Sequence, residues 1–307
     1  MKPKNLIPLL SLAVIWGAYY VASNKAVECM SVFNVGIIIR LLTMLFLTVI
    51  MLGKGEMHTL LHTRGVRLRL LLIGLMGFLL DYTAFAGLQL SASAGIGTAL
   101  LKTDILFVNL LSVILYRRHF SRREWLYTFV MLFGVLMVMG LGLSSLSQID
   151  PGCLFFILSA LFVSVNAFLI KSVQRSQVNP VSNRVIAYYN NFITMLFFLA
   201  TAAAMRTFDQ FARIGSSRPL ALALLIAGLG QTLVYIVYYY NLSHFPVWLV
   251  KIFLLFMPVV SCVISFVLFD EKLGSKQIAG MLVVLIGALG ILIEQRRKGE
   301  GELANQM

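Results

Sequence analysis

Ten long apolar runs dominate this sequence and limit what it can fold into. They lie at about residues 5–23, 32–52, 69–90, 93–116, 124–145, 152–171, 184–205, 219–241, 246–269 and 276–293. Each run approaches the roughly 20 residues that a helix needs to cross the hydrocarbon core of a bilayer. The longest loops between them, at about 54–68 and 206–218, are too short to fold alone. The sequence therefore predicts an integral, multi-pass membrane protein without a soluble domain.

The composition and the N-terminus agree with this prediction. Hydrophobic residues make up 60% of the chain and charged residues 12%, which lies far outside the range of soluble proteins. The first residues, Met1–Lys4 followed by an apolar run, are similar to a signal peptide. However, the segment "WGAYYVASNKA" offers only a weak small-residue cleavage site. We therefore expect the first helix to be retained.

The positions of the 25 basic residues predict the topology of the chain. With the N-terminus inside and ten crossings, sixteen of them fall on the cytoplasmic side: Lys2, Lys4, Lys54, Arg64, Arg67, Arg69, Arg117, Arg118, Arg122, Arg123, Lys171, Arg175, Arg184, Arg296, Arg297 and Lys298. Six fall outside: Lys25, Arg206, Arg213, Arg218, Lys272 and Lys276. This bias follows the positive-inside rule and does not indicate nucleic-acid binding. We expect both termini to be cytoplasmic, in a bacterial inner membrane.

The two halves of the chain carry signs of an internal repeat. The segment "TMLF" at Thr43–Phe46 recurs at Thr194–Phe197, an offset of 151. An offset of 153 relates a second set of matches: Leu101 with Leu254, Ser112 with Ser265, Leu115 with Leu268, Gly134 with Gly287 and Leu136 with Leu289. Each match is weak alone, but the offset is shared. Many transporters consist of two such copies inserted in opposite senses.

Five helices per copy is an odd number, so the second copy must be inverted in the membrane. The predicted fold class is an all-α membrane protein whose ten transmembrane helices form two inverted five-helix repeats. The first repeat spans residues 1–147 and the second residues 148–293, and residues 294–307 form a short cytoplasmic tail.

Three segments together carry a family resemblance. They are "WGAYY" in the first helix, the arginine of "IIIRLLTML" in the second, and "LLFMPVVSCVISFVLFDEKLGSKQIAGMLVVLIGALGIL" in the last two. They resemble the drug/metabolite transporter superfamily, EamA type. The resemblance implies a central cavity between helices 1–4 and 6–9, with helices 5 and 10 beside it, and solute transport by alternating access. Within the last segment, Pro258 predicts a bend in the ninth helix, because proline kinks a helix.

Five ionisable side chains lie at membrane depth: Arg40, Asp81, Lys102, Asp104 and Lys251. Exposed to lipid, the five would cost on the order of 15 kcal/mol, so they must face protein or water. Lys102 and Asp104 are two residues apart, about 200° around a helix, and cannot pair with each other. We expect Asp81, at similar depth on the neighbouring helix, to pair with Lys102. Arg40 is expected to serve Asp104 or Asp81.

Two interpretations of these charges stay open: structural pairs within the bundle, or groups that bind a solute. In the repeat alignment Arg40 corresponds to Asn191 and Lys102 to Leu255, so the charges are concentrated in one half. A scaffold does not need this asymmetry, which favours solute binding for Lys102. Three cations against two carboxylates leave one surplus positive charge. The surplus favours an anionic or zwitterionic solute, such as an amino-acid-like metabolite.

Two finer similarities suggest phosphorylated solutes as an alternative. The segment "LLKTDILF" resembles the fourth helix of plastid sugar-phosphate translocators, in which a lysine binds the phosphate, and Lys102 matches that lysine. Lys251 falls where that group has Lys-Arg, but Ile252 replaces the arginine. The segment "YYNN", Tyr188–Asn191, is similar to the Tyr-Asn-Asn motif of nucleotide-sugar transporters, whose Gly-Ala-Leu-Asn-Lys partner motif is absent here.

Uncharged side chains complete the predicted binding site because they can stack on a solute or hydrogen-bond to it. The candidates are Trp16, Tyr189, Asn191, Gln231 and Tyr235. We expect no catalytic residue, no metal site and no cofactor, since no nucleophile–base pair and no metal-ligand spacing is found.

The predicted function is a secondary-active carrier whose partners are a small-molecule solute and the lipid bilayer. An intramembrane enzyme is the alternative from another class, and a channel would require one continuous polar pore. A carboxylate, Asp104 or Asp81, is the candidate carrier of a coupling proton. We expect a monomer or a homodimer and no nucleic-acid partner.

Overall fold

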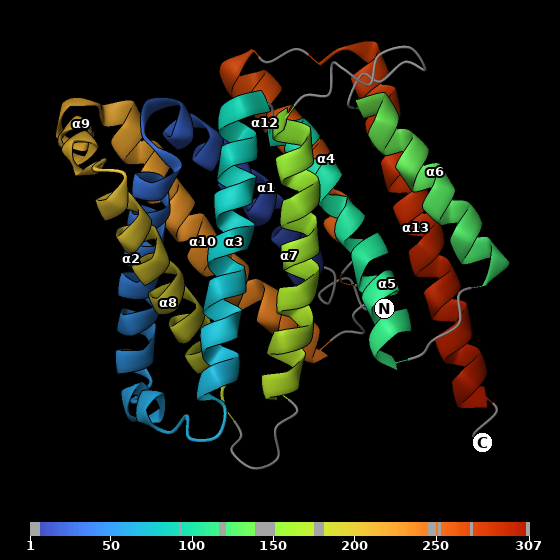
Figure 1. Cartoon of the computed structure of the whole chain (residues 1–307), viewed down its shortest axis with the longest axis horizontal. Coiled ribbons are helices and arrows are strands. Elements are labelled where there is room, and N and C mark those ends of the chain that lie inside the picture. Colours follow the sequence, from blue (N-terminus) through green and yellow to red (C-terminus); the bar gives the residue numbers. More distant parts are fainter. Residues whose placement is uncertain are drawn as a thin grey trace.

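The computed structural model describes residues 7–91, 94–116, 121–138, 151–174, 181–244, 250, 253–270 and 273–304 (Figure 1). The α-helices are α1 (Ile7–Cys29), α2 (Val32–Gly53), α3 (Arg67–Ser91), α4 (Ala94–Leu100), α5 (Asp104–Tyr116), α6 (Arg122–Val138), α7 (Pro151–Gln174), α8 (Asn183–Ala204), α9 (Ala212–Ser216), α10 (Arg218–His244), α12 (Met257–Phe269) and α13 (Ser275–Ala304). Short 3₁₀ turns lie at η2 (Met57–Leu61), η3 (Leu101–Thr103) and η5 (Phe208–Phe211). No strand occurs in the described ranges, so the all-α class is confirmed.

The outer surface of the bundle is apolar. On α2, the side chains of Leu41, Leu45, Val49 and Leu52 recur at helical spacing and are each more than half exposed. Arg40, on the same helix, is only 1% exposed. A protein surrounded by water shows the opposite distribution, since charged side chains are almost never fully buried unless paired. The apolar exterior and the buried charge fit a surface in contact with lipid.

Six helices, namely α1, α2, α3, α7, α8 and α10, are long and apolar enough to cross a membrane. The prediction of a multi-pass membrane protein is confirmed. The four other predicted spans coincide with α4 plus α5, with α6, with α12 and with α13. Over the described residues, α12 and α13 offer only the shorter apolar stretches Met257–Phe269 and Ile278–Glu294.

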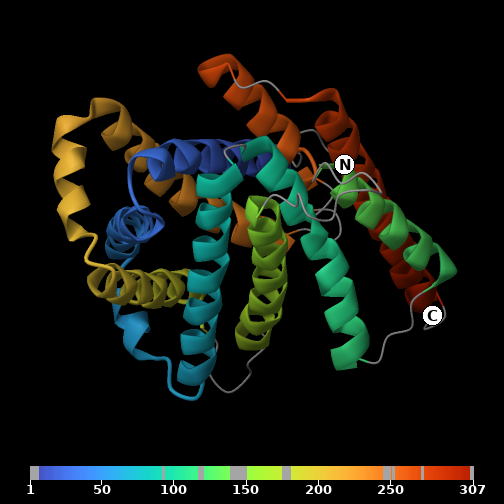
Figure 2. The same ribbon diagram turned by 45° about the horizontal axis from the view of Figure 1, so that its top comes forward.

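Helices from the two halves of the chain pack against one another in matching pairs. The first helix α1 packs on α10, α3 on α7, α2 on α8, α4 on α12 and α6 on α13. The α6–α13 pair stands at one side of the bundle in both views (Figures 1 and 2). The equivalent helices of the two halves are α1 and α7, α2 and α8, and α3 and α10. If each helix in the list of pairs is replaced by its equivalent, the same pairs result. Two repeats related by a twofold axis pack in this way.

The repeated "TMLF" segments occupy equivalent contacts. Thr43 Oγ1 lies 3.4 Å from the carbonyl oxygen of Gly228, to which it donates a hydrogen bond. In the other half, Thr194 Oγ1 would lie 2.7 Å from a Cβ atom built on Gly77. The differences 194 − 43 and 228 − 77 both equal 151, the offset expected from the sequence. The two halves are therefore related in their contacts as well as in their order of helices.

The α6–α13 interface shows the second offset. A Cβ atom built on Gly134 would lie 2.6 Å from the backbone nitrogen of Val284, and one on Gly287 would lie 2.7 Å from that of Met131. The differences 287 − 134 and 284 − 131 both equal 153. Glycine allows the two backbones to approach this closely, as small residues do between membrane helices.

We expect the variant Gly287→Ala to be less stable to heat than the parent. The added Cβ meets a backbone atom that has no rotamer to adopt, so α6 and α13 must separate, and such overpacking costs about 1–3 kcal/mol. Helix propensity alone favours alanine over glycine by about 0.8–1.0 kcal/mol. Gly215→Ala is the matched control, because nothing lies within 4 Å of a Cβ atom there. Thermal unfolding in detergent compares them, and equal melting temperatures would contradict the close approach.

The predicted span 93–116 is not one continuous helix. It is interrupted by η3 between α4 and α5, at Leu101–Thr103. Thr103 Oγ1 donates a hydrogen bond to the carbonyl oxygen of Leu100 (2.8 Å), and Ser164 Oγ of α7 donates one to the carbonyl oxygen of Asp104 (2.9 Å). Side-chain hydroxyls thus donate hydrogen bonds to backbone carbonyl oxygens at the interruption. A short 3₁₀ segment inside a helix often marks a functional hinge.

The predicted span 246–269 is interrupted as well. A turn at Leu255–Phe256 precedes α12, and the Phe256 N–H donates to the carbonyl oxygen of Phe253 (3.1 Å). Pro258 lies in the first turn of α12, where its missing N–H costs nothing. The interruption therefore coincides with the bend predicted at this proline. Adding 153 to residues 101–103 gives 254–256, so both interruptions occupy equivalent positions in the two halves.

Candidate functional site

The interruption between α4 and α5 places Lys102 and Asp104 beside a small cavity. The cavity measures about 30 Å³, room for about one water molecule. It is lined by Trp16, Tyr20, Leu101, Lys102, Asp104, Val163, Tyr238, Leu254 and Met257. The lining comes from α1, η3, α5, α7, α10 and α12 together with Leu254, so both halves of the chain contribute. Helices must move apart here before a metabolite can enter.

The two charged side chains of this cavity are deeply buried. Lys102 is 6% exposed and Asp104 is 5% exposed. The Lys102 ammonium lies 5.9 Å from the centre of the Trp16 ring, within the range of a cation–π interaction. The Trp16 ring in turn packs edge-on against Tyr238, with ring centroids 5.6 Å apart. A cation, a carboxylate and aromatic faces thus surround one small space.

A second polar cluster is centred on Arg40 of α2. Its guanidinium forms an ion pair with Asp81 of α3. Arg40 Nη1 also donates to Asn191 Oδ1 (2.7 Å) and to the Tyr235 hydroxyl (3.1 Å), which accepts a further bond from Asn190 Nδ2 (2.9 Å). Four helices, α2, α3, α8 and α10, are thereby joined by one hydrogen-bonded network.

The expected pairing of Asp81 with Lys102 is wrong, because the partner of Asp81 is Arg40. The similar depth of the two residues suggested Lys102 as the partner of Asp81. However, depth in the membrane does not determine toward which neighbouring helix a side chain points. The alternative that Arg40 serves Asp81 is confirmed. Lys102 and Asp104, although two residues apart, both line the same cavity. The structure therefore separates the four described charges into the Arg40–Asp81 pair and the cavity-lining Lys102 and Asp104.

The remaining predicted residues lie in different places. Tyr189 donates its hydroxyl to the carbonyl oxygen of Leu60 (2.8 Å) and packs with the cluster beside the η2 loop, away from the cavity lining. Gln231 is buried on α10, one helical turn before Tyr235. Lys251 lies outside the described residues. Of the ten predicted residues, Trp16, Lys102 and Asp104 meet at one cavity, while Arg40, Asp81, Asn191 and Tyr235 form the network.

Three residues with polar side chains in these two groups were not among the predicted site residues. Tyr20 lines the cavity four residues after Trp16, so helical spacing from Trp16 could have indicated it. Asn190 precedes Asn191 and joins the network. Tyr238 belongs to a run of three tyrosines, and no sequence signal distinguishes it from its two neighbours.

Comparison with known proteins gives a family and a fold. The profile of the EamA-like transporter family matches residues 4–140 and again residues 150–293. A solved structure titled "Crystal structure of protein" superposes with a TM-score of 0.66 at 16% identity, covering 94% of this chain and 96% of the other. At this identity the likeness concerns the fold. No curated protein sequence gives a significant match.

Proposed function

Because this chain belongs to the EamA-like transporter family, we propose that it is a secondary-active carrier moving a small polar metabolite by alternating access. The family consists of membrane transporters of small solutes, not of enzymes. This supports a transporter over the intramembrane enzyme considered from the sequence.

The observation that carries the proposal is the pair of helix interruptions at Leu101–Thr103 and Leu255–Phe256. In transporters built from repeats, substrate sites lie at the repeat interface, where interrupted helices occur at corresponding positions of the two halves. Here the first interruption carries the buried Lys102, and the cavity at it is lined from both halves. A solute bound at this place would contact the segments about which the halves rock.

The charges of the cavity favour a zwitterionic or anionic solute. Arg40 and Asp81 neutralise each other in the network, whereas Lys102 and Asp104 line the cavity, where the ammonium can attract an anionic group of the solute and the carboxylate a cationic one. The rings of Trp16 and Tyr20 offer apolar surface for the rest of the molecule. An amino-acid-like metabolite matches this set. A phosphorylated sugar, the alternative suggested by the resemblance around Lys102, would bring two negative charges beside Asp104.

Transport into protein-containing liposomes tests this proposal. Radiolabelled amino acids should enter in a saturable manner. Uptake should be faster when the same solute is present on the other side, because a single alternating site exchanges solute between the two sides. A sugar phosphate serves as the competing substrate. Flux that does not saturate would indicate a channel, and sugar-phosphate exchange without amino-acid exchange would overturn the proposed solute class.

The proposed topology has ten spans in two inverted repeats, residues 1–147 and 148–293, with both termini in the bacterial cytoplasm. It is supported by the 16-to-6 distribution of basic residues in the sequence and by the equivalent contacts across the halves. We expect a reporter enzyme fused after residue 307 to read as cytoplasmic. A fusion after Ser216, in the predicted outer loop, is the control that should read as external. The opposite pattern would refute the orientation.

Asp104 is the proposed carrier of a coupling proton, because it lines the cavity, whereas Asp81 lies in the Arg40 network. A carboxylate can exchange its proton as its surroundings change during alternating access. We expect Asp104→Asn to retain solute exchange but to lose acceleration by a pH gradient, measured in the same liposomes. Asp209→Asn, in the 3₁₀ turn η5 at the surface, is the control. If Asp104→Asn still responds to the gradient, coupling does not involve this residue.

A further inference from the structure

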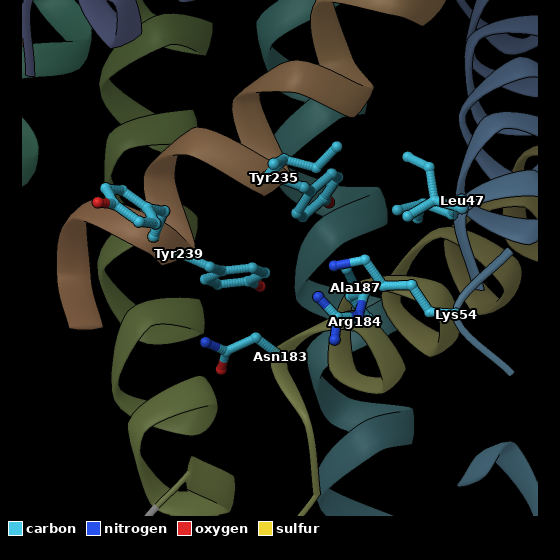
Figure 3. A pocket seen from close by; sticks show the side chains of 10 residues that line it. Leu47, Lys54, Asn183, Arg184, Ala187, Tyr235 and Tyr239 are labelled. Atoms are coloured by element: carbon cyan, nitrogen blue, oxygen red, sulfur yellow. The ribbon is translucent and has the colours of Figure 1, made fainter. Parts of the chain in front are cut away.

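A larger pocket lies away from the Lys102 cavity, between α2, α8 and α10. It measures about 340 Å³ and is lined by Leu47, Ile50, Lys54, Asn183, Arg184, Ala187, Tyr235, Ile236, Tyr239 and Tyr240 (Figure 3). Lys54 directly follows α2 and Arg184 is the second residue of α8, and these two helix ends lie at the same end of the bundle (Figure 1). The pocket therefore opens at the level where the spans leave the hydrocarbon.

The charged lining of this pocket is entirely positive. Lys54 and Arg184 extend into it from α2 and α8 (Figure 3). Arg184 also binds both carboxylate oxygens of Glu56 outside the lining. Those hydrogen bonds lower the pKa of the Glu56 carboxyl below its ordinary value, so it stays ionised at neutral pH and holds Arg184 in place. Lys54 makes no ion pair with any described residue and supplies the charge that is not offset.

The walls of the pocket are apolar and reach the outer surface of the bundle. Leu47 and Ile50 form the α2 wall. On α10, Ile236 is 39% exposed and Tyr240 is 46% exposed, on the surface that faces the bilayer. Tyr239 lies about 6 Å further out than Tyr235 along α10 at 1.5 Å per residue. A molecule in the pocket can therefore touch cations at one end and hydrocarbon at the other.

We propose that this pocket binds an anionic phospholipid, with the phosphate at Lys54 and Arg184 and an acyl chain along Ile50 and Ile236. A lipid fits better than a soluble anion because the apolar wall continues onto the membrane-facing surface. Clusters of basic residues at the cytoplasmic membrane surface attract anionic lipids in this way. The site does not depend on the identity of the transported solute.

A bound lipid would also contact the buried hydrogen-bonded network of Arg40 through Tyr235. Tyr235, at the deep end of the pocket, accepts hydrogen bonds from Arg40 and from Asn190. Occupancy of the pocket fills the space between α10 and the other two helices and keeps this tyrosine in place. Lipid binding should therefore raise the thermal stability of the protein, because a ligand that binds only the folded state stabilises it by mass action.

The test measures thermal unfolding of the purified full-length protein in a non-ionic detergent. Phosphatidylglycerol should raise the melting temperature, whereas phosphatidylcholine and inorganic phosphate should not. Lys54→Gln should weaken the apparent affinity for phosphatidylglycerol about fivefold, the effect of one basic residue near an anionic surface. A double variant, Glu56→Gln with Arg184→Gln, should weaken it similarly without leaving an unpaired carboxylate.

Arg67→Gln is the matched control, because Arg67 is an exposed cation at the start of α3, at the same end of the bundle, and does not line the pocket. It should keep the parent's affinity. Equal weakening in Arg67→Gln would mean attraction to the whole basic surface and would overturn the site. Stabilisation by inorganic phosphate alone would assign the pocket to a soluble anion instead of a lipid. An unchanged affinity in Lys54→Gln and in the double variant would also overturn the proposal.

Discussion

Lys102→Ala is expected to abolish solute binding and transport while the protein still inserts and purifies as a folded species. The ammonium is buried beside Trp16 in a cavity lined from both halves of the chain. Losing one partner of a buried charged contact costs about 2–5 kcal/mol, which weakens binding by about 30-fold or more. Binding to purified protein and exchange in liposomes measure the two losses separately.

The melting temperature distinguishes solute binding by Lys102 from a structural role. An ammonium at membrane depth is costly while its site is empty. Removing it should eliminate the increase in melting temperature that solute produces. Lys25→Ala is the control, because Lys25 pairs with Glu28 near the end of α1 and does not line the cavity. If Lys102→Ala binds and transports as the parent does, the residue is structural, and the site must be sought elsewhere.

Asp81→Ala is expected to give the largest loss of stability. Arg40 is 1% exposed, and its ion pair with Asp81 balances its charge inside the bundle. Removing one partner of a buried pair costs about 3–5 kcal/mol, because an uncompensated charge is left behind. The free energy of unfolding, or the melting temperature in detergent, should fall accordingly. Arg40→Ala should have an effect of similar size.

A double variant decides whether the pair serves only the structure. Arg40→Met combined with Asp81→Leu removes both charges and keeps apolar volume, so most of the lost stability should return. If the pair is structural, this variant also transports. A stable double variant that binds no solute would return Arg40 and Asp81 to the substrate site. A double variant no more stable than Asp81→Ala would contradict the ion pair as the source of the loss.

Much of the fold could be predicted because it follows from properties of the chain that do not depend on packing. Apolar runs of bilayer length require membrane-spanning helices. The repeat offsets came from segments as short as "TMLF". The offset of 151 relates the Thr43–Gly228 contact to the contact between Thr194 and Gly77. The offset of 153 relates the Gly134–Val284 contact to the contact between Gly287 and Met131. An interruption near Pro258 was also predictable, since proline lacks the N–H that a helix interior uses and is favoured in the first turn of a helix. The 3₁₀ turn at Leu101–Thr103 was not, because no proline or glycine marks it.

The candidate site was predicted only in part. The sequence by itself determined that Arg40, Asp81, Lys102 and Asp104 must face protein or water, because lipid cannot solvate charge. The tertiary structure decided which of them meet: Asp81 joins Arg40, and Lys102 and Asp104 join Trp16 at one cavity. Tyr189, equally plausible from sequence, contacts the η2 loop instead. The reason is geometric, since hydropathy sets the depth of a residue, whereas its neighbours depend on how each helix is rotated and packed.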